Sequence, residues 1–311
     1  MKKQQKEIGV SRRDFLKTAT GTAAGIGISQ MFNPALVRAL QKELETHPVL
    51  WIQGQGCTGC SVSLLNSVEP SIADVLLKII SLQFHPSVMA SEGETALQNL
   101  YRISQKYKGK FSLAVEGAIP IAAEGKYCIV GELGHKEITI LDLVKDLGAK
   151  AGSVLAVGTC AAYGGVPAAK GNETGATGVM DIFKTNKITT PVVNIPGCPP
   201  HPDWIVGSIA HLLTKGIPSV DAYGRPNVFY ADNIHDNCPR LDEYEEGNMA
   251  EKLSEHQGCR MDIGCKGPDT SADCFKRKWN SGMNWCVDNA VCIGCVEPGF
   301  PDSSSPFYEP A

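Results

Sequence analysis

The chain of 311 residues has no run of about 18 uncharged apolar residues outside its N-terminal segment, so no membrane span is expected in the rest of the chain. It also has no basic patch. The 29 Lys and Arg against 33 Asp and Glu give a formal charge of −4, which argues against a nucleic-acid partner. No repeat of fixed period and no low-complexity linker interrupts the sequence. Hydrophobic residues at 43% and charged residues at 20% are near the globular average, which excludes wholesale disorder.

Cysteine is abundant instead. The chain has 12 cysteines, too few for a small disulfide scaffold and too many for a protein that uses cysteine only to fill its core. Their positions therefore carry most of the functional information.

Residues 1–39 are predicted to be a targeting segment that is not part of the fold. Its parts are a basic start with the adjacent pair Arg12 and Arg13, a mild apolar stretch over 18–32 and a small-residue cleavage candidate at 37–39. This order resembles a twin-arginine signal, which implies export to the periplasm of a protein that is already folded. Thiols that bind metal before export are not free to form disulfides. The signal and the cysteine count together therefore favour a metalloprotein over a disulfide protein.

Residues 46–221 show an α/β pattern. Short apolar runs predict five buried parallel strands, at 49–53, 81–84, 111–117, 153–158 and 191–197. Helical periodicity lies between them, over 61–80 with an interruption at Pro70, and over 92–108, 138–147 and 201–213. This alternation predicts a doubly wound parallel sheet.

The pattern changes in residues 222–311. Long apolar runs disappear, and seven cysteines fall between Cys238 and Cys295. A segment with so little apolar periodicity has few means of burying an ordinary core, so we expect an irregular domain stabilised by metal clusters.

Four cysteines of the first domain follow predicted strands. They are Cys57, Cys60, Cys160 and Cys198. The carboxyl ends of parallel strands form the ligand crevice of an open α/β sheet, so these thiols are predicted to meet there and to bind an iron–sulfur cluster or zinc. The alternative is four separate buried core thiols. Cys128 has no glycine-rich or paired context and is interpreted as a core residue.

The second domain holds seven cysteines and one histidine with metal-ligand spacing, enough for two further four-ligand sites. These residues are His235, Cys238, Cys259, Cys265, Cys274, Cys286, Cys292 and Cys295. Structural zinc is the simpler alternative, because the CIGC motif alone suits a zinc ribbon. A secreted binding module stapled by zinc or disulfides therefore stays open as a function from another class.

The motifs in combination resemble the small subunit of nickel–iron hydrogenases over nearly the whole chain. They are CTGCS, VEGAIP, GTCAAYGG, PGCPPHPDW, IHDNCPR, GCKGP, WNSGMNWC and CIGCVEPGFPD, together with the twin-arginine signal. The resemblance implies a flavodoxin-like domain followed by an irregular cluster domain. It also implies an oxidoreductase in which a large subunit splits hydrogen at a nickel–iron centre, H2 ⇌ 2 H+ + 2 e−. The small subunit would relay electrons and be active only in the heterodimer.

The resemblance also implies a ligand set for each of three iron–sulfur clusters. The proximal site would consist of Cys57, Cys60, Cys160 and Cys198. The distal site would consist of His235, Cys238, Cys259 and Cys265. The medial site would consist of Cys274, Cys286, Cys292 and Cys295. No catalytic residue is expected in this chain.

Cys286 departs from the commonest family pattern, in which proline follows the Asn-Trp pair and the medial cluster has three irons. A cysteine here would complete a 4Fe–4S cluster, a pattern similar to the nickel–iron–selenium branch, although a 3Fe–4S cluster stays the alternative. Oxygen-tolerant members carry two extra cysteines near the proximal cluster. This sequence has Gly59 and Gly165 there, which implies an ordinary four-thiolate cluster.

The resemblance implies that electrons leave through the distal cluster to a redox protein such as a multihaem cytochrome in the periplasm. The alternative within redox chemistry is an electron-transfer subunit of a quinone- or ferredoxin-linked complex. The resemblance leaves it open because the first domain also occurs outside the hydrogenases.

Overall fold

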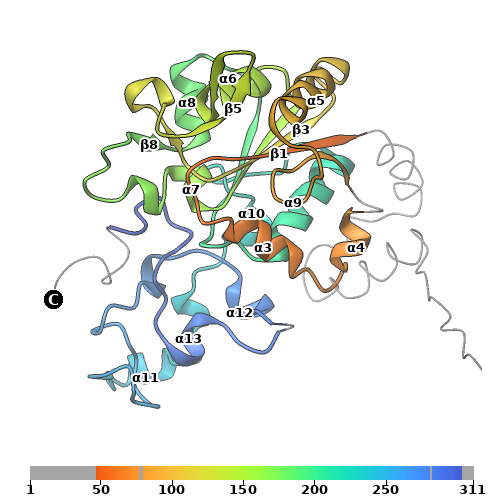
Figure 1. Ribbon diagram of the computed structural model, residues 1–311. Helices are drawn as coiled ribbons and strands as arrows, with labels where there is room; N and C mark the ends of the chain where they lie inside the picture. The colour runs from red at the N-terminus through yellow and green to blue at the C-terminus, as the bar shows by residue number, and fades with distance from the viewer. Residues whose placement is uncertain (1–46, 77–79, 281, 303–311) are drawn as a thin grey trace, which may run out of the picture.

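A five-stranded parallel sheet lies at the centre of the computed structural model, which describes residues 47–76, 80–280 and 282–302 (Figure 1). The strands, in spatial order, are β2 (Ser81–Phe84), β1 (Pro48–Gln53), β3 (Ser112–Glu116), β7 (Ser153–Val157) and β9 (Val192–Ile195). This is the flavodoxin-like order of a doubly wound sheet. All five predicted strands are present, so the predicted α/β class is confirmed. The predicted targeting segment, residues 1–39, lies outside the described residues.

Helices cover both faces of the sheet (Figure 1). Those of the sheet-bearing part are α3 (Gly59–Leu65), α4 (Ile72–Asp74), α5 (Gly93–Lys106), α6 (Ile140–Gly148), α7 (Thr159–Tyr163), α8 (Val179–Thr185) and α9 (Pro202–Lys215). The remaining strands form two small pairs, β4 (Ile119–Pro120) with β8 (Ala176–Thr177), and β5 (Ile129–Leu133) with β6 (Lys136–Thr139).

The start of α6 differs from the sequence prediction for a local reason. Helical periodicity begins at 138, but Ile138 and Thr139 pair with β5 as the last residues of β6. Thr139 then caps α6, because its hydroxyl accepts a hydrogen bond from the Asp142 amide at 3.1 Å and the Asp142 carboxylate accepts one from the Thr139 amide. This capping box fixes the first helical residue at Ile140.

The alternation of side chains along each strand gives the sheet two buried faces. On one face, Leu50 and Ile52 of β1 pack in a cluster that also contains residues of α5, α6 and α8. On the other face, Val49 and Trp51 pack in a cluster with Trp204 of α9. Strands buried on both sides explain why their sequences are continuous apolar runs.

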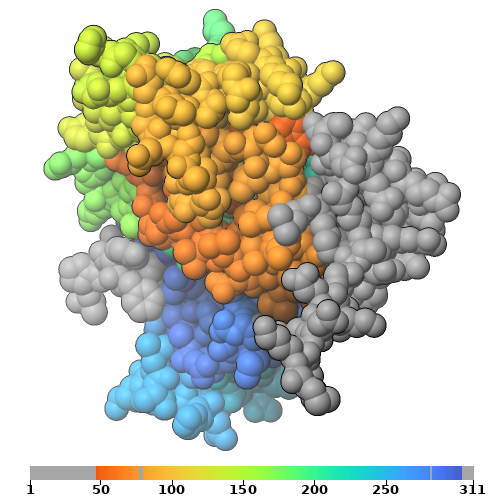
Figure 2. All heavy atoms as spheres, turned by 45° about the vertical axis from the view of Figure 1, so that its right-hand side comes forward, coloured from red at the N-terminus to blue at the C-terminus, as the bar shows by residue number. Residues whose placement is uncertain are grey.

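The C-terminal region is built from loops and short elements at one end of the molecule (blue in Figure 2). Its helices are α10 (Asn227–Tyr230), α11 (Leu241–Glu245), α12 (Cys274–Arg277) and α13 (Cys286–Asn289), with 3-10 turns at His235–Asn237 and Gly267–Asp269. Its apolar residues, such as Phe229, Trp285 and Val296, belong to the same buried cluster as Val49 and Trp51. This region therefore shares its core with one face of the sheet.

Buried ion pairs join the C-terminal region to the sheet. Arg225 is 4% exposed and lies between Asp221 at 2.7 Å and Glu297 at 2.9 Å. The Asp273 carboxylate accepts hydrogen bonds from Trp204 Nε1 and Arg277 Nε, both at 2.7 Å. These pairs fix the position of the loops that carry the second set of cysteines.

Among the described residues, no helix combines the length and apolar character that crossing a bilayer requires.

Candidate metal-cluster sites

The proximal site lies where the sheet changes winding direction. The chain leaves β1 for β2 on one side and returns to β3 on the other, so the crevice at the switch point opens between the carboxyl ends of β1 and β3. Cys57 and Cys60 follow β1, and Cys60 is the second residue of α3. Cys160 is the second residue of α7, after β7, and Cys198 follows β9. The loops after β1, β7 and β9 thus place the four predicted thiols at the carboxyl-terminal edge of the sheet.

The four thiols interact with one another. Burial raises the pKa of the Cys60 thiol well above its usual value, and the nearby charges of Glu116, Cys160, Cys198 and Cys57 raise it further. Burial, with the charges of Cys198 and Cys57, also raises the pKa of Cys160 to about 11. Mutual repulsion of this kind means that the four groups lie close together. A bound cationic metal group relieves that repulsion and keeps all four as thiolates.

Glu116 holds the loop that carries the first two cysteines. Its carboxylate is 3% exposed and accepts hydrogen bonds from the backbone amides of Cys60 at 3.0 Å and Ser61 at 3.1 Å. The same group accepts from Trp51 Nε1 at 3.0 Å and Gln53 Nε2 at 2.9 Å. Glu116 ends β3 and thereby fixes the orientation of the start of α3. Sequence reasoning did not single it out, because its only signal is its position within VEGAIP.

Glycines allow the backbone to come close to these thiols. A Cβ on Gly158 would lie 2.4 Å from Cys60 Sγ, and Gly158 has a φ of +89°, so a side chain here is excluded both by space and by conformation. A Cβ on Gly59 would lie 3.0 Å from Cys57 Sγ, and one on Gly165 would lie 3.0 Å from Cys160 Sγ. Gly59 and Gly165, singled out in the sequence, therefore both face proximal thiols.

Sequence reasoning also passed over the glycine spacing of this turn. Gly54, Gly56 and Gly59 follow the order G-x-G-x-x-G between β1 and α3, which is the spacing of dinucleotide-binding turns. In this chain, Cys57 lies within the turn and Cys60 directly follows it. The glycines of the turn therefore let the backbone come close to thiols.

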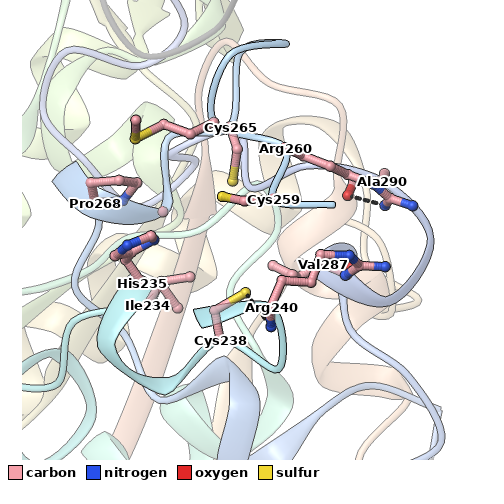
Figure 3. Close-up of a pocket in the computed structure, with 12 residues that line it drawn as sticks. Ile234, His235, Cys238, Arg240, Cys259, Arg260, Cys265, Pro268, Val287 and Ala290 are labelled. Atoms are coloured by element: carbon pink, nitrogen blue, oxygen red, sulfur yellow. Dashed lines mark hydrogen bonds between the residues drawn. The ribbon is translucent and has the colours of Figure 1, made fainter. Parts of the chain in front are cut away.

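The predicted distal residues line a cavity that is partly open to solvent. Figure 3 shows the sulfur atoms of Cys238, Cys259 and Cys265 directed toward a common space, with the His235 ring at its side. The ring of Tyr244 lies against His235, edge to face, with centroids 4.6 Å apart. His235 is half-buried, and Asp242, Tyr244 and Glu245 of α11 are exposed. The site is therefore close to the protein surface.

The predicted medial residues also lie together. Cys286 donates a hydrogen bond from its thiol to Cys292, which raises the pKa of Cys286 and lowers that of Cys292 to about 7. The charges of Cys274 and Cys295 raise the pKa of Cys286 further. Cys274 and Cys292 are buried, whereas Cys286, the first residue of α13, is exposed. Cys286 thus lies within reach of the other three thiols.

Neighbouring sites are in direct contact through the backbone. Burial raises the pKa of the Cys295 thiol to about 12, and the backbone amide of the proximal residue Cys198 acts in the opposite direction. Burial also raises the pKa of Cys265, in the distal site, and the backbone amide of the medial residue Cys292 again lowers it. The Thr159 hydroxyl, next to Cys160, donates to the Cys295 carbonyl. The medial site therefore touches both of its neighbours.

The three groups of side chains fit iron–sulfur clusters better than disulfides or single metal ions. All twelve cysteines are described, and all are free thiols, so no disulfide joins them. In the described ranges no group of three or more His, Cys, Asp or Glu side chains is arranged to hold one metal ion. The distal donors surround a cavity rather than a point. Sulfur donors around a space of this kind match iron–sulfur ligation. Cys128 is apart from these groups and packs against the other face of the sheet.

Two family models match the chain. Residues 57–212 match the model described as NADH ubiquinone oxidoreductase, 20 Kd subunit. Residues 230–308 match the model for the C-terminal part of the NiFe/NiFeSe hydrogenase small subunit. The first model is named for a subunit of another redox complex. The second covers the region with the predicted medial and distal cysteines.

Individual relatives align over nearly the whole chain. The periplasmic NiFeSe hydrogenase small subunit of Desulfomicrobium baculatum is 54% identical over 97% of this chain and 99% of its own length. The periplasmic NiFe hydrogenase small subunit of Solidesulfovibrio fructosivorans is 39% identical over 97% and 93%. In the oxidised structure of the recombinant NiFeSe hydrogenase from Desulfovibrio vulgaris Hildenborough, a chain 59% identical in sequence superposes with a TM-score of 0.82, covering 85% of this chain and 98% of that one.

The close contact at Gly158 leads to a prediction about the proximal site. Gly158→Ala places a methyl group against Cys60 Sγ and should abolish cluster binding there, lowering the iron content by about four atoms per chain. Gly134→Ala is the matched control, since Gly134 also has a positive φ, +61°, but open space around it. Both variants carry a backbone strain of about 1 kcal/mol. Full iron content in purified Gly158→Ala protein would contradict the prediction.

Proposed function

The chain belongs to the family of NiFe and NiFeSe hydrogenase small subunits, and we propose that it relays electrons through three iron–sulfur clusters held by its three groups of thiols. The observation that carries this proposal is the contact between successive groups. Cys198 of the first reaches Cys295 of the second, and Cys292 of the second reaches Cys265 of the third. A continuous series of sites is what an electron-transfer subunit needs.

Each cluster has its own ligand set in this proposal. The proximal cluster is bound by Cys57, Cys60, Cys160 and Cys198, the medial cluster by Cys274, Cys286, Cys292 and Cys295, and the distal cluster by His235, Cys238, Cys259 and Cys265. The bound clusters supply one-electron carriers whose potentials depend on charge, hydrogen bonds and solvent exposure. The chain's own residues orient the thiols, exclude water from the buried ones and fix the spacing of the sites.

The proposal divides the chain by cluster. Residues 46–221 form the flavodoxin-like domain with the proximal cluster, and residues 222–311 form the domain with the other two. The family models, which match 57–212 and 230–308, support this division. The shared buried cluster of Val49, Trp204 and Trp285 supports a fixed relation between the two parts.

The large hydrogenase subunit is the partner, because the relatives are small subunits of hydrogenases. We place the interface at the proximal crevice, where Cys57 and Cys198 are exposed in the single chain. A first carrier has to lie next to the active site that it serves, and the exposed thiols mark the side on which the partner covers it. The reaction of the complex is H2 ⇌ 2 H+ + 2 e−.

The test is the metal content of the purified heterodimer. Three 4Fe–4S clusters require about twelve iron and twelve sulfide atoms per small subunit. Replacing one thiol of each group in turn, with Cys160→Ala, Cys292→Ala and Cys259→Ala, should change one cluster at a time. Cys128→Ala is the matched control, because Cys128 packs in the core away from the three groups. A colourless protein, or zinc in place of iron, would refute the proposal.

The type of the medial cluster gives a separate prediction. Cys286 is the first residue of α13, a position that tolerates proline, so Cys286→Pro should preserve the fold. With one thiolate fewer, the cluster should lose an iron and its potential should rise. Electron paramagnetic resonance of the oxidised complex should then show a three-iron signal in Cys286→Pro and none in Cys128→Ser. A stoichiometric three-iron signal in anaerobically purified wild-type protein would show that Cys286 is not a ligand.

The surface around the distal site favours a basic electron partner, such as a multihaem cytochrome. Exposed acidic side chains outnumber exposed lysines in residues 232–258, the segment that contains His235, where the one exposed lysine is Lys252. The exposed acids are Asp236, Asp242, Glu245, Glu246 and Glu251. A one-signed patch attracts an oppositely charged protein and raises its association rate.

Neutralising part of this acidic surface should slow the association of the electron partner. At low salt, Glu245→Gln with Glu246→Gln should reduce the association rate with a basic cytochrome by up to about tenfold and weaken its salt dependence. Glu132→Gln with Glu137→Gln is the control, because these exposed acids lie on the β5–β6 hairpin of the sheet domain. Equal rates for the two double variants in stopped-flow measurements would count against docking at this surface.

Export by the twin-arginine route is also part of the proposal. The relatives are named periplasmic, and the adjacent Arg12 and Arg13 precede an apolar stretch. Changing both to lysine should leave a folded, cluster-loaded precursor in the cytoplasm, as cell fractionation can measure. The exchange of Lys2 and Lys3 for arginine is the control. Normal periplasmic yield of the variant with Arg12→Lys and Arg13→Lys would contradict the prediction of twin-arginine export.

A further inference from the structure

Two arginines among the described residues are buried, and they differ in their partners. Arg225, 4% exposed, has two carboxylate partners within 2.9 Å. Arg260, 6% exposed, has no ion pair with an acidic side chain in the described part of the chain. A buried cation without a counter-charge is costly, so a negative group is expected beside Arg260.

The hydrogen bonds of Arg260 leave one of its three guanidinium nitrogens without a partner. Its Nη1 donates to the Ala290 carbonyl at 2.6 Å and its Nη2 to the Glu255 carbonyl at 3.0 Å. Its Nε is buried and has no hydrogen-bond partner. The side chain lines the distal cavity, on the side opposite His235 (Figure 3).

Arg240 lies beside Arg260 in the same wall and repeats the pattern (Figure 3). Its Nη1 donates to the Val287 carbonyl at 2.7 Å, and its backbone amide donates to Cys238 Sγ at 3.4 Å. Its Nε is buried without a hydrogen-bond partner. Its Nε forms a long ion pair with Glu243 Oε2 at 3.9 Å, too far for a hydrogen bond, and that oxygen has no hydrogen-bond partner either. Glu243 thus offsets one of the two positive charges at most.

We propose that Arg260, with Arg240 beside it, is the counter-charge of the distal cluster and raises its reduction potential. This inference rests on the proposed function, because the negative group is the cluster that Cys238, Cys259 and Cys265 would hold in the cavity. Three thiolates give that cluster a net negative charge, and each added electron makes it more negative. A fixed positive charge at the cavity wall therefore stabilises the reduced form more than the oxidised form.

This arrangement also accounts for the choice of arginine. Two of the guanidinium nitrogens donate to backbone carbonyls, those of Ala290 at the end of α13 and of Glu255, and Nε has no hydrogen-bond partner. A lysine supplies the same charge with fewer donors in fixed directions. Charge and hydrogen-bond geometry can therefore be separated by substitution.

The test is a potentiometric titration of the holoenzyme heterodimer, followed by electron paramagnetic resonance and resolved into its cluster steps. Arg260→Gln removes the charge and keeps a hydrogen-bond donor, whereas Arg260→Lys keeps the charge. Arg240→Gln tests the same wall by a second route if Arg260→Gln assembles poorly. Arg102→Gln is the matched control, because Arg102 is an exposed arginine on α5 whose side chain bonds to Asn99.

We expect Arg260→Gln to shift the redox equilibrium of the distal cluster about tenfold toward the oxidised form. This lowers its reduction potential by about 59 mV for one electron. Arg260→Lys should keep most of the wild-type potential, and Arg102→Gln should keep all of it. Unchanged potentials in Arg260→Gln and Arg240→Gln, or an equal shift in Arg260→Lys, would overturn the inference. Iron content distinguishes a failure of this inference from a failure of the proposed function. Wild-type protein that lacks the distal cluster would refute the proposed function, whereas unchanged potentials in protein with full iron content would refute only the inference.

Discussion

Buried thiols that ionise close to one another repel, and the rest of this structure depends on how that repulsion is relieved. The fold assembles three groups of such thiols, and burial and mutual charge raise the pKa of most of them. Protein charges do little to compensate at the proximal site, where the ionisable neighbour with the largest effect on Cys60 is the acidic Glu116. In the proposed function, positive iron bound at these sites would relieve the repulsion and stabilise the thiolates.

The sheet domain and the C-terminal region meet this constraint differently. The proximal thiols lie at the end of a sheet whose core is complete on both faces. The medial and distal thiols lie in loops whose apolar residues join the core on one face of the sheet. These loops have only short helices, and the ion pairs of Arg225 and Asp273 fix their position. Metal ligation, as proposed above, would supply further constraints.

Much of the fold, and the gathering of four thiols at one edge of the sheet, could be predicted because their signals are local. Strands buried on both faces give continuous apolar runs, and a cysteine directly after such a run has to lie at the crevice. The roles of Glu116 and Arg260 were not predictable in this way. Glu116 contacts residues more than fifty positions away, and Arg260 is set apart only by the lack of a carboxylate partner. Such contacts depend on tertiary packing, which leaves no periodic pattern in the sequence.

The exposure of Cys57 and Cys198 in the single chain has a consequence for the order of assembly. A solvent-facing cysteine sulfur is open to oxidants, and its sulfonic acid state is irreversible. The unpaired subunit therefore has a limited lifetime once air reaches it. At the interface proposed above, early pairing with the large subunit would shield both sulfurs from oxidation.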